Sequence, residues 1–277
     1  MNVFEAVILG IVQGLTEFLP VSSSGHLVLM QKIFGVTEPA LFFDTMLHAG
    51  TLLAVFLVLW KDIWVIIRRP IQPLTGLLIL ATIPTVIAAL VFKDAVEHAF
   101  ESGQFLGFSF LLTASLLCAA ELLSRRQIGA PAHGGDTNGL KKAKDMNWLD
   151  ALVIGLLQAV AIIPGVSRSG ATISGALSRG LDRDFTARFS FLLSIPAILG
   201  AVLFQAKDLI TDGAAAAGSL GTGAVVAGTA ISAIVGFFAI RLMMKIIRER
   251  SLFGFAIYTA ILGTLVLVDQ FLTHLVF

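Results

Sequence analysis

Three residues near the start of the chain have the types and the spacing needed for nucleophilic catalysis. Ser23 lies three residues before His26, so a helix would place both side chains on one face. A serine beside a histidine can act as a nucleophile with its general base. Glu17, which lies within an apolar run, could orient the histidine or bind a divalent cation. We therefore predict that Glu17, Ser23 and His26 are catalytic, with Ser23 as the nucleophile and His26 as the base and later the acid.

A second polar segment repeats the first at a distance of 145 positions. Residues 151–170 align with residues 6–25 without a gap, and 7 of the 20 positions are identical. In this alignment Arg168, flanked by two serines, stands opposite Ser23. Arginine binds phosphate oxygens through parallel hydrogen bonds. The pair of segments therefore predicts a binding site for a phosphate or diphosphate, with Arg168 as a fourth catalytic residue.

Both copies have the pattern of a helix that stops before a turn rich in Ser, Gly and Pro. Residues 3–19 and 149–163 are apolar runs, and a short second apolar stretch follows each, at residues 27–34 and 171–178. These second stretches are too short to cross a bilayer, which takes about 20 helical residues. We expect two re-entrant helical hairpins, each entering and leaving on one side, with polar tips buried in protein or facing water. Two thin complete spans per copy are the alternative.

The composition indicates an integral membrane protein. Of the 277 residues 57% are hydrophobic and 13% are charged, and the mean hydropathy is +0.92, which excludes a soluble domain. We predict one all-α integral membrane domain over residues 1–277, with repeat one at 1–124, a cytoplasmic linker at 125–147 and repeat two at 148–277. Six further runs are long and apolar enough to be transmembrane helices: 41–60, 75–92, 105–124, 186–204, 222–240 and 252–272.

The order of these elements predicts an inverted-topology repeat. A hairpin returns to its own side and three spans then change sides, so the second repeat starts from the opposite face. With this assignment 15 of the 19 Lys and Arg residues lie on one face, three lie on the other, and Arg168 lies at the second hairpin tip. Cytoplasmic loops carry the excess of Lys and Arg. Both chain termini and the active site are therefore expected to face outside.

Hairpins that enter from opposite faces should meet near the middle of the bilayer, as in inverted-repeat transporters. The free N–H groups of two half-helices would then favour an anion beside Glu17 and Arg168. A purely structural pair of Arg168 and Glu17, and serines that only cap helices, are the alternatives. We expect polar and glycine residues of both tips to bind the substrate: Gln13, Ser22, Ser24, Gly25, Ser167, Ser169 and Gly170.

Other polar residues in the apolar runs are assigned structural roles. His48, four residues after Asp44 near the outer end of a span, is expected to make an interfacial hydrogen bond rather than to take part in catalysis. Asp150, at the start of the second hairpin, is expected to cap it.

The two tip motifs resemble signatures of the undecaprenyl-diphosphate phosphatase family, the bacitracin-resistance type of bacterial membrane phosphatase. QGLTEFLPVSSSGH at Gln13–His26 is similar to that family's [E/Q]xxxE and SSxGH elements, and PGVSRSG at Pro164–Gly170 is similar to its second signature. The resemblance covers essentially the whole chain. It implies hydrolysis of undecaprenyl diphosphate to undecaprenyl phosphate and phosphate at the outer face of the cytoplasmic (inner) membrane, which recycles the lipid carrier for cell-wall synthesis.

The resemblance also implies a divalent cation, Mg²⁺ or Ca²⁺, and a polyprenyl diphosphate lipid as the substrate. Gln13 departs from the family's double-Glu form, so we expect Glu17 alone to bind the cation, with substrate phosphates completing the coordination. Membrane lipids are expected partners, nucleic acid is not, and a homodimer is left open. His26 as the phosphorylated nucleophile stays an alternative to Ser23. A polyprenyl-lipid transporter or flippase is the rival function, because inverted repeats with broken helices are typical of carriers.

Overall fold

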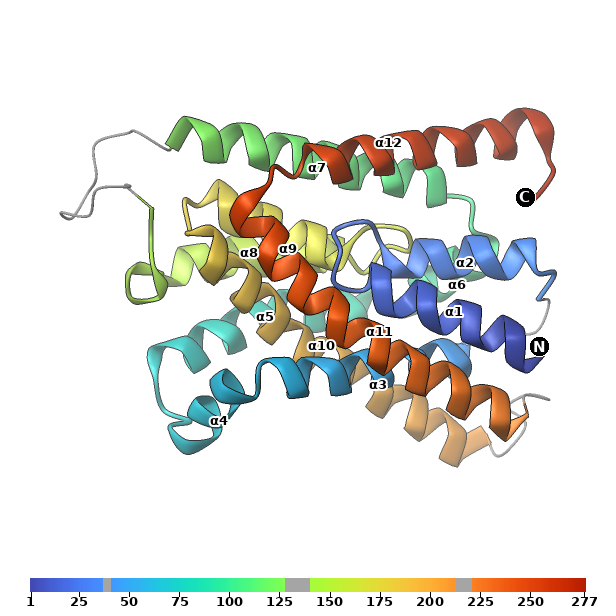
Figure 1. Cartoon of the computed structure of the whole chain (residues 1–277), viewed down its shortest axis with the longest axis horizontal. Coiled ribbons are helices and arrows are strands. Elements are labelled where there is room, and N and C mark those ends of the chain that lie inside the picture. The colour runs from blue at the N-terminus through green and yellow to red at the C-terminus, as the bar shows by residue number, and fades with distance from the viewer. Residues whose placement is uncertain (37–40, 128–139, 213–220) are drawn as a thin grey trace.

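The computed structural model describes residues 1–36, 41–127, 140–212 and 221–277, and its regular elements within these residues are helices (Figure 1). α-Helices of 9 to 30 residues alternate with short turns. In chain order the elements are α1 (Val3–Thr16), α2 (Ser23–Ile33), α3 (Leu41–Val58), α4 (Trp60–Arg68), α5 (Pro73–Val91), α6 (Lys93–Ser102), α7 (Leu106–Gln127), the short 3₁₀ helix η1 (Ala143–Asp145), α8 (Trp148–Val160), α9 (Arg168–Ser178), α10 (Arg183–Asp212), α11 (Thr222–Glu249), α12 (Phe253–Val268) and the π-helical turn η3 (Asp269–Thr273).

Five helical segments among the described residues are long and apolar enough to cross a membrane: α5, α7, α10, α11, and α12 together with η3. Helix α3 meets the same criterion only together with α4, from which a bend of 80° separates it. These five to six candidate spans confirm the prediction of an all-α, multi-pass membrane protein. Helices α1 and α8, with 14 and 13 residues, are too short to cross, as expected of half-helices in a re-entrant hairpin.

The bend between α3 and α4 corrects the predicted span at 41–60, because the spanning helix ends at Val58 and α4 turns away from Trp60 onward. The charged residues of α4 begin at once, with Lys61 after Trp60. The Trp60 and Trp64 rings stack at 5.3 Å, and the Arg68 guanidinium lies 4.7 Å from the Trp64 ring centre. A short helix with tryptophan and basic residues is typical of the membrane interface.

The two broken-helix pairs enter the molecule from opposite ends (Figure 1). Helices α1 and α2 occupy the end that carries both chain termini, whereas α8 and α9 lie toward the end that carries α4. The turns between the half-helices face each other in the middle, and α7 packs along α12 at one edge. This arrangement supports the predicted inverted repeat. The division at 125–147 stays a prediction, because residues 128–139 lie outside the described residues.

Equivalent positions of the two copies perform the same packing role. Helix α1 packs along α11, and α8 packs along α5. A Cβ atom on Gly10 would lie 2.5 Å from the Gly228 carbonyl oxygen, and one on Gly155, its repeat partner, 2.4 Å from that of Ala81. Small residues at crossing points let membrane helices approach closely. Gly10 and Gly155 therefore let α1 and α8 pack closely against a span of the other repeat.

A serine caps the second half-helix of each copy. Ser22 Oγ accepts a hydrogen bond from Gly25 N at 3.2 Å, and Ser167 Oγ accepts one from Gly170 N at 3.0 Å. These bonds satisfy N–H groups that a helix start leaves free. The caps fix where α2 and α9 begin, and so which tip residue comes first in each helix.

Candidate active site

The tips of the two hairpins touch. The backbone N–H of Gly165 donates to Ser24 Oγ at 3.3 Å, and Ser169 Oγ donates to the backbone carbonyl of Leu19 at 3.0 Å. A Cβ atom on Gly25 would lie 3.1 Å from Gly165 Cα. Gly25 therefore permits the contact between the tips, and its predicted contact with substrate stays a prediction.

Glu17 is the centre of the polar contacts between the tips. Its Oε2 accepts hydrogen bonds from Ser23 Oγ at 2.6 Å and from Gln13 Nε2 at 3.0 Å. Its Oε1 accepts one from Arg168 Nη2 at 2.9 Å. Glu17 is only 5% exposed, and a buried carboxylate needs such partners to stay charged. The structure thus brings together three of the four predicted catalytic residues, from both repeats.

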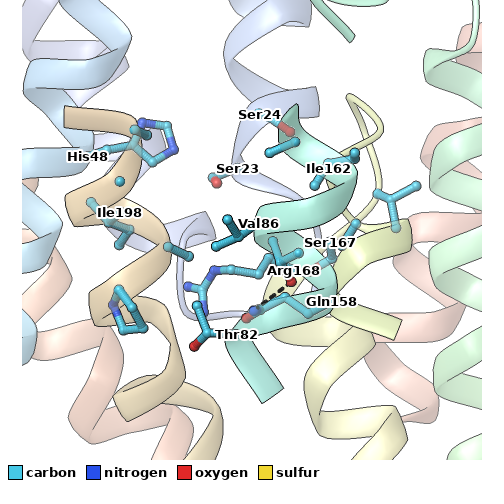
Figure 2. A pocket seen from close by; sticks show the side chains of 18 of the residues that line it. Ser23, Ser24, His48, Thr82, Val86, Gln158, Ile162, Ser167, Arg168 and Ile198 are labelled. Carbon is cyan, nitrogen blue, oxygen red and sulfur yellow. Dashed lines mark hydrogen bonds between the residues drawn. The ribbon is translucent and has the colours of Figure 1, made fainter. Parts of the chain in front are cut away.

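A cavity of about 390 Å³ opens beside this cluster, between the tips and the helices α5 and α10 (Figure 2). Ser23 and Ser24 line it from the first tip, and Ser167 and Arg168 line it from the second. Figure 2 shows the Arg168 side chain reaching into the space between α5 and α10. The remaining wall is mostly apolar, so charged groups at the tips act in a site with few competing polar neighbours.

Both second half-helices begin at the cavity. Ser23 is the first residue of α2 and Arg168 is the first residue of α9. Helix N-termini favour anions because their free N–H groups and the helix dipole point at the ligand. An anion in the cavity would meet two helix N-termini, one guanidinium and the serine residues Ser23, Ser24 and Ser167.

Arg168 forms an ion pair with Glu17, which the sequence analysis gave as an alternative to a catalytic role, and it also lines the cavity. Its Nη2 binds Glu17, and its Nη1 donates to the backbone carbonyl of Ser190 at 3.4 Å. Its side chain is 15% exposed, whereas that of Glu17 is 4% exposed. The pair therefore holds the guanidinium in place while part of it remains accessible from the cavity.

His26 lies away from the Glu17 cluster, which removes the geometry predicted for a Ser23–His26 pair. Its Nδ1 bonds the backbone carbonyl of Ser22 at 2.7 Å, and its Nε2 bonds the Tyr258 hydroxyl at 2.7 Å. The Ser23 hydroxyl donates to Glu17 instead. Side chains in a helix lean toward its N-terminus, which carries the imidazole back onto the cap residue rather than sideways to Ser23.

His48 is a site residue that the sequence reasoning missed. Its Nδ1 bonds the backbone carbonyl of Asp44 at 2.7 Å, and its Nε2 lies 3.5 Å from Glu17 Oε2 and faces the cavity. A carbonyl only accepts, so Nδ1 carries the proton and Nε2 is directed at the site. The expected hydrogen bond is formed, but it orients the ring for contact with Glu17. No local sequence signal separates this role from a structural one.

The remaining predicted residues support the tips in different ways. Gln13 is fully buried and reaches the cavity only through its bond to Glu17. Ser22 and Gly170 belong to the helix caps, and Ser169 joins the tips. Of the seven residues predicted to bind substrate, Ser24 and Ser167 line the cavity.

Gln158 is a second residue that the prediction missed, although the repeat carried a signal for it. It occupies the position of Gln13 in the second copy, lines the cavity and donates to Thr85 Oγ1 at 2.9 Å (Figure 2). Thr82 and Thr85 of α5 line the cavity with it. A search of both copies for the same side chain would have found the glutamine but not the threonines.

A divalent cation would find an incomplete set of ligands here. Among the residues that the structure describes, no three His, Cys, Asp or Glu side chains gather to hold a metal ion. Glu17 and His48 are the donors at the cavity, and Gln13 Oε1 is a buried acceptor without a hydrogen-bond partner. Mg²⁺ and Ca²⁺ take six or more oxygen ligands. These residues fit a cation when phosphate oxygens supply the remaining ligands.

Comparison with known proteins assigns the family. Residues 6–265 match the family model described as bacitracin resistance protein BacA. The chain is 45% identical over 270 residues to a protein of Carboxydothermus hydrogenoformans named undecaprenyl-diphosphatase, with 98% of each chain covered. Proteins of Alkaliphilus metalliredigens and Methanosphaera stadtmanae with the same name are 42% and 40% identical, over 98% and 97% of this chain and 100% and 98% of their own. The chain therefore belongs to the bacitracin resistance protein BacA family.

Proposed function

We propose that the protein is an undecaprenyl-diphosphate phosphatase, which hydrolyses undecaprenyl diphosphate to undecaprenyl phosphate and phosphate. The relatives named above carry this activity in their names and match nearly the whole chain. The single structural observation that carries the proposal is the hydrogen-bonded set of Ser23, Glu17 and Arg168 at the touching tips. A nucleophile, a proton acceptor and a phosphate-binding cation are the groups that phosphoryl transfer needs.

Ser23 is the nucleophile in this proposal, and Glu17 takes its proton. The Ser23 hydroxyl already donates to Glu17 Oε2 at 2.6 Å. As Ser23 Oγ bonds to the terminal phosphorus, its proton passes to Glu17, which then releases it to solvent. The bridging P–O bond breaks, and undecaprenyl phosphate leaves with the bonding electrons. This assignment replaces His26, whose two ring nitrogens bond Ser22 and Tyr258.

Water completes the reaction. A water molecule attacks the phosphoserine, Glu17 accepts its proton, and the P–Oγ bond breaks as that proton returns to Ser23. Arg168 and the N-termini of α2 and α9 offset the negative charge on the phosphoryl oxygens. A bound divalent cation would neutralise further charge on the diphosphate, and Glu17 and His48 would hold it together with phosphate oxygens.

An apolar groove of about 520 Å³ adjoins the cavity and suits the prenyl chain. It shares Thr82, Val86 and Pro196 with the cavity and continues along α4, α5 and α10. Its lining is mostly Ile and Leu, with Phe56, Val86, Pro196 and two threonines. In the proposal the first isoprene units lie in this groove and the rest of the chain lies in the bilayer.

The proposed location is the cytoplasmic membrane, with the site open to the periplasm or outside. The excess of basic residues on the face away from the chain termini supports this orientation. The names of the relatives refer to hydrolysis of the lipid and not to its transport, so hydrolysis is preferred over a flippase.

Phosphate release from a polyprenyl diphosphate by the purified protein in detergent tests the proposal. Wild type should release phosphate, and Ser23→Ala should lose nearly all activity. Ser115→Ala is the matched control, because its exposed hydroxyl bonds only the Leu111 carbonyl of its own helix. Substrate binding without phosphate release would refute the proposal and favour a carrier.

A further inference from the structure

We infer that Tyr258 is a positioning residue for the reaction, acting through His26 on the turn that presents Ser23. The inference rests on the proposed function. Tyr258 lies on α12, outside the cavity, and its hydroxyl bonds His26 Nε2. His26 in turn bonds the carbonyl of Ser22, the residue directly before the nucleophile. The chain Tyr258–His26–Ser22 thus joins a distant span to the catalytic turn.

The turn needs this support because its backbone is strained. Ser22 has φ 73° and ψ 97°, in a region that residues with a side chain rarely occupy. Such a conformation costs about 1–3 kcal/mol and persists only where neighbouring contacts impose it. Two bonds from one residue converge on the Ser22 carbonyl: His26 N at 3.2 Å and His26 Nδ1 at 2.7 Å. His26 therefore fixes the peptide that connects Ser22 to Ser23.

The hydrogen bonds define the protonation of His26. The Ser22 carbonyl only accepts, so Nδ1 carries a proton. A neutral ring then has its lone pair on Nε2, which accepts from the Tyr258 hydroxyl. The Tyr258 ring stacks on the imidazole at 5.8 Å and 11°, and Phe110 meets it edge-on at 5.4 Å. The ring thus contacts two aromatic rings and is bonded at both nitrogens, which suits a fixed support better than a proton carrier.

The second repeat provides an internal comparison. Ser167, the partner of Ser22, has φ −71° and ψ 117°, an ordinary extended conformation. The position equivalent to His26 is Ala171, and Thr113 of α7 contacts this tip. Thr113 binds the Ser167 backbone N–H directly at 3.0 Å. The imidazole and its tyrosine partner thus contact the tip whose cap residue is strained, and an alanine stands in place of the histidine at the other tip.

Substitutions at both positions separate support from proton transfer. His26→Asn keeps a side-chain N–H near the place of Nδ1 but has no base, whereas His26→Ala removes both. We expect His26→Ala to lower kcat about 100-fold, as displacement of a reacting group by about 1 Å does. His26→Asn should stay within about tenfold of wild type, since one neutral hydrogen bond contributes about tenfold or less. Equal inactivity of the two variants would overturn the inference.

Tyr258→Phe should lower kcat about tenfold with KM unchanged, because it removes one hydrogen bond far from the substrate. Added to His26→Asn, it should cause no further loss, since the two residues act in one chain. Thr264→Val is the matched control: it also removes a hydroxyl from α12, one that bonds only Ala260 of the same helix. A Tyr258→Phe enzyme as active as Thr264→Val, or independent losses in the double variant, would contradict the assignment.

A spectroscopic measurement does not depend on turnover. In protein labelled at histidine, nuclear magnetic resonance should show His26 as the neutral Nδ1–H tautomer, with its Nε2 signal shifted in Tyr258→Phe. An Nε2–H tautomer or an imidazolium at neutral pH would overturn the inference. If wild type released no phosphate from a polyprenyl diphosphate, the proposed function would fail. The magnetic resonance measurement would still decide whether the hydrogen bonds from Tyr258 through His26 to Ser22 exist.

Discussion

Replacement of Arg168 by Ala tests the two roles of this residue, which are to pair with the buried Glu17 and to bind the substrate phosphates. The substitution leaves the Glu17 carboxylate buried, with neutral partners and His48 but without its arginine. Loss of one partner from a buried ion pair costs about 3–5 kcal/mol of folding stability. Because the cavity beside the pair is open, the cost of leaving Glu17 unpaired is smaller, and we expect a loss of about 2–3 kcal/mol of folding stability. Activity should fall further, by about 10³-fold or more, since removal of an arginine that stabilises phosphoryl transfer has this effect.

A second variant distinguishes unfolding from lost catalysis. Glu17→Gln combined with Arg168→Ala removes the unpaired charge, so the thermal midpoint should recover toward wild type while phosphate release stays absent. Arg168→Lys keeps a positive charge without the planar fork and should be intermediate in activity. Phosphate release and thermal unfolding, both measured in detergent, provide the two readouts. An Arg168→Ala enzyme within tenfold of wild-type activity would refute the role of Arg168 in catalysis.

Three further predictions test the packing, the groove and the missed histidine. The variants Gly10→Ala and Gly155→Ala should each lower the thermal midpoint, because the new methyl group would lie 2.5 Å and 2.4 Å, respectively, from a backbone oxygen. The control Gly76→Ala should leave the midpoint unchanged, because no atom lies within 4 Å of its new methyl group. Ile83→Trp should raise KM for long prenyl diphosphates and leave that for a short-chain analogue unchanged, because it fills the groove and not the cavity. His48→Ala should lower kcat about tenfold without loss of stability, since it removes a partner of Glu17 at the cavity wall; unchanged kinetics would exclude His48 from the site.

The sequence was sufficient to predict the membrane class, the broken helices and the contact between the tips. These features depend on local signals: long apolar runs, a repeated Ser/Gly turn, and charged residues in apolar surroundings. Glu17, Ser23 and Arg168 were found because an ionisable or nucleophilic side chain inside such a turn is unusual. The inverted order of the repeats was predicted by counting spans, and it stays a prediction.

The residues that the sequence did not place depend on contacts between distant segments. Tyr258 lies 232 positions from His26, and nothing near either residue indicates their hydrogen bond. His48 was interpreted from its own helix alone, and its approach to Glu17 depends on how α3 packs beside the first tip. The 80° bend lies between Val58 and Trp60, and apolar length alone carried the predicted span across it to residue 60.

A structure of the protein with bound vanadate, an analogue of the phosphoryl group in transfer, tests the central claim most directly. The account predicts vanadium bonded to Ser23 Oγ, with Arg168 in hydrogen-bond contact with a vanadate oxygen and both hairpin tips around it. Vanadate bound elsewhere, or tips too far apart for Ser23 and Arg168 to contact one anion, would contradict the account.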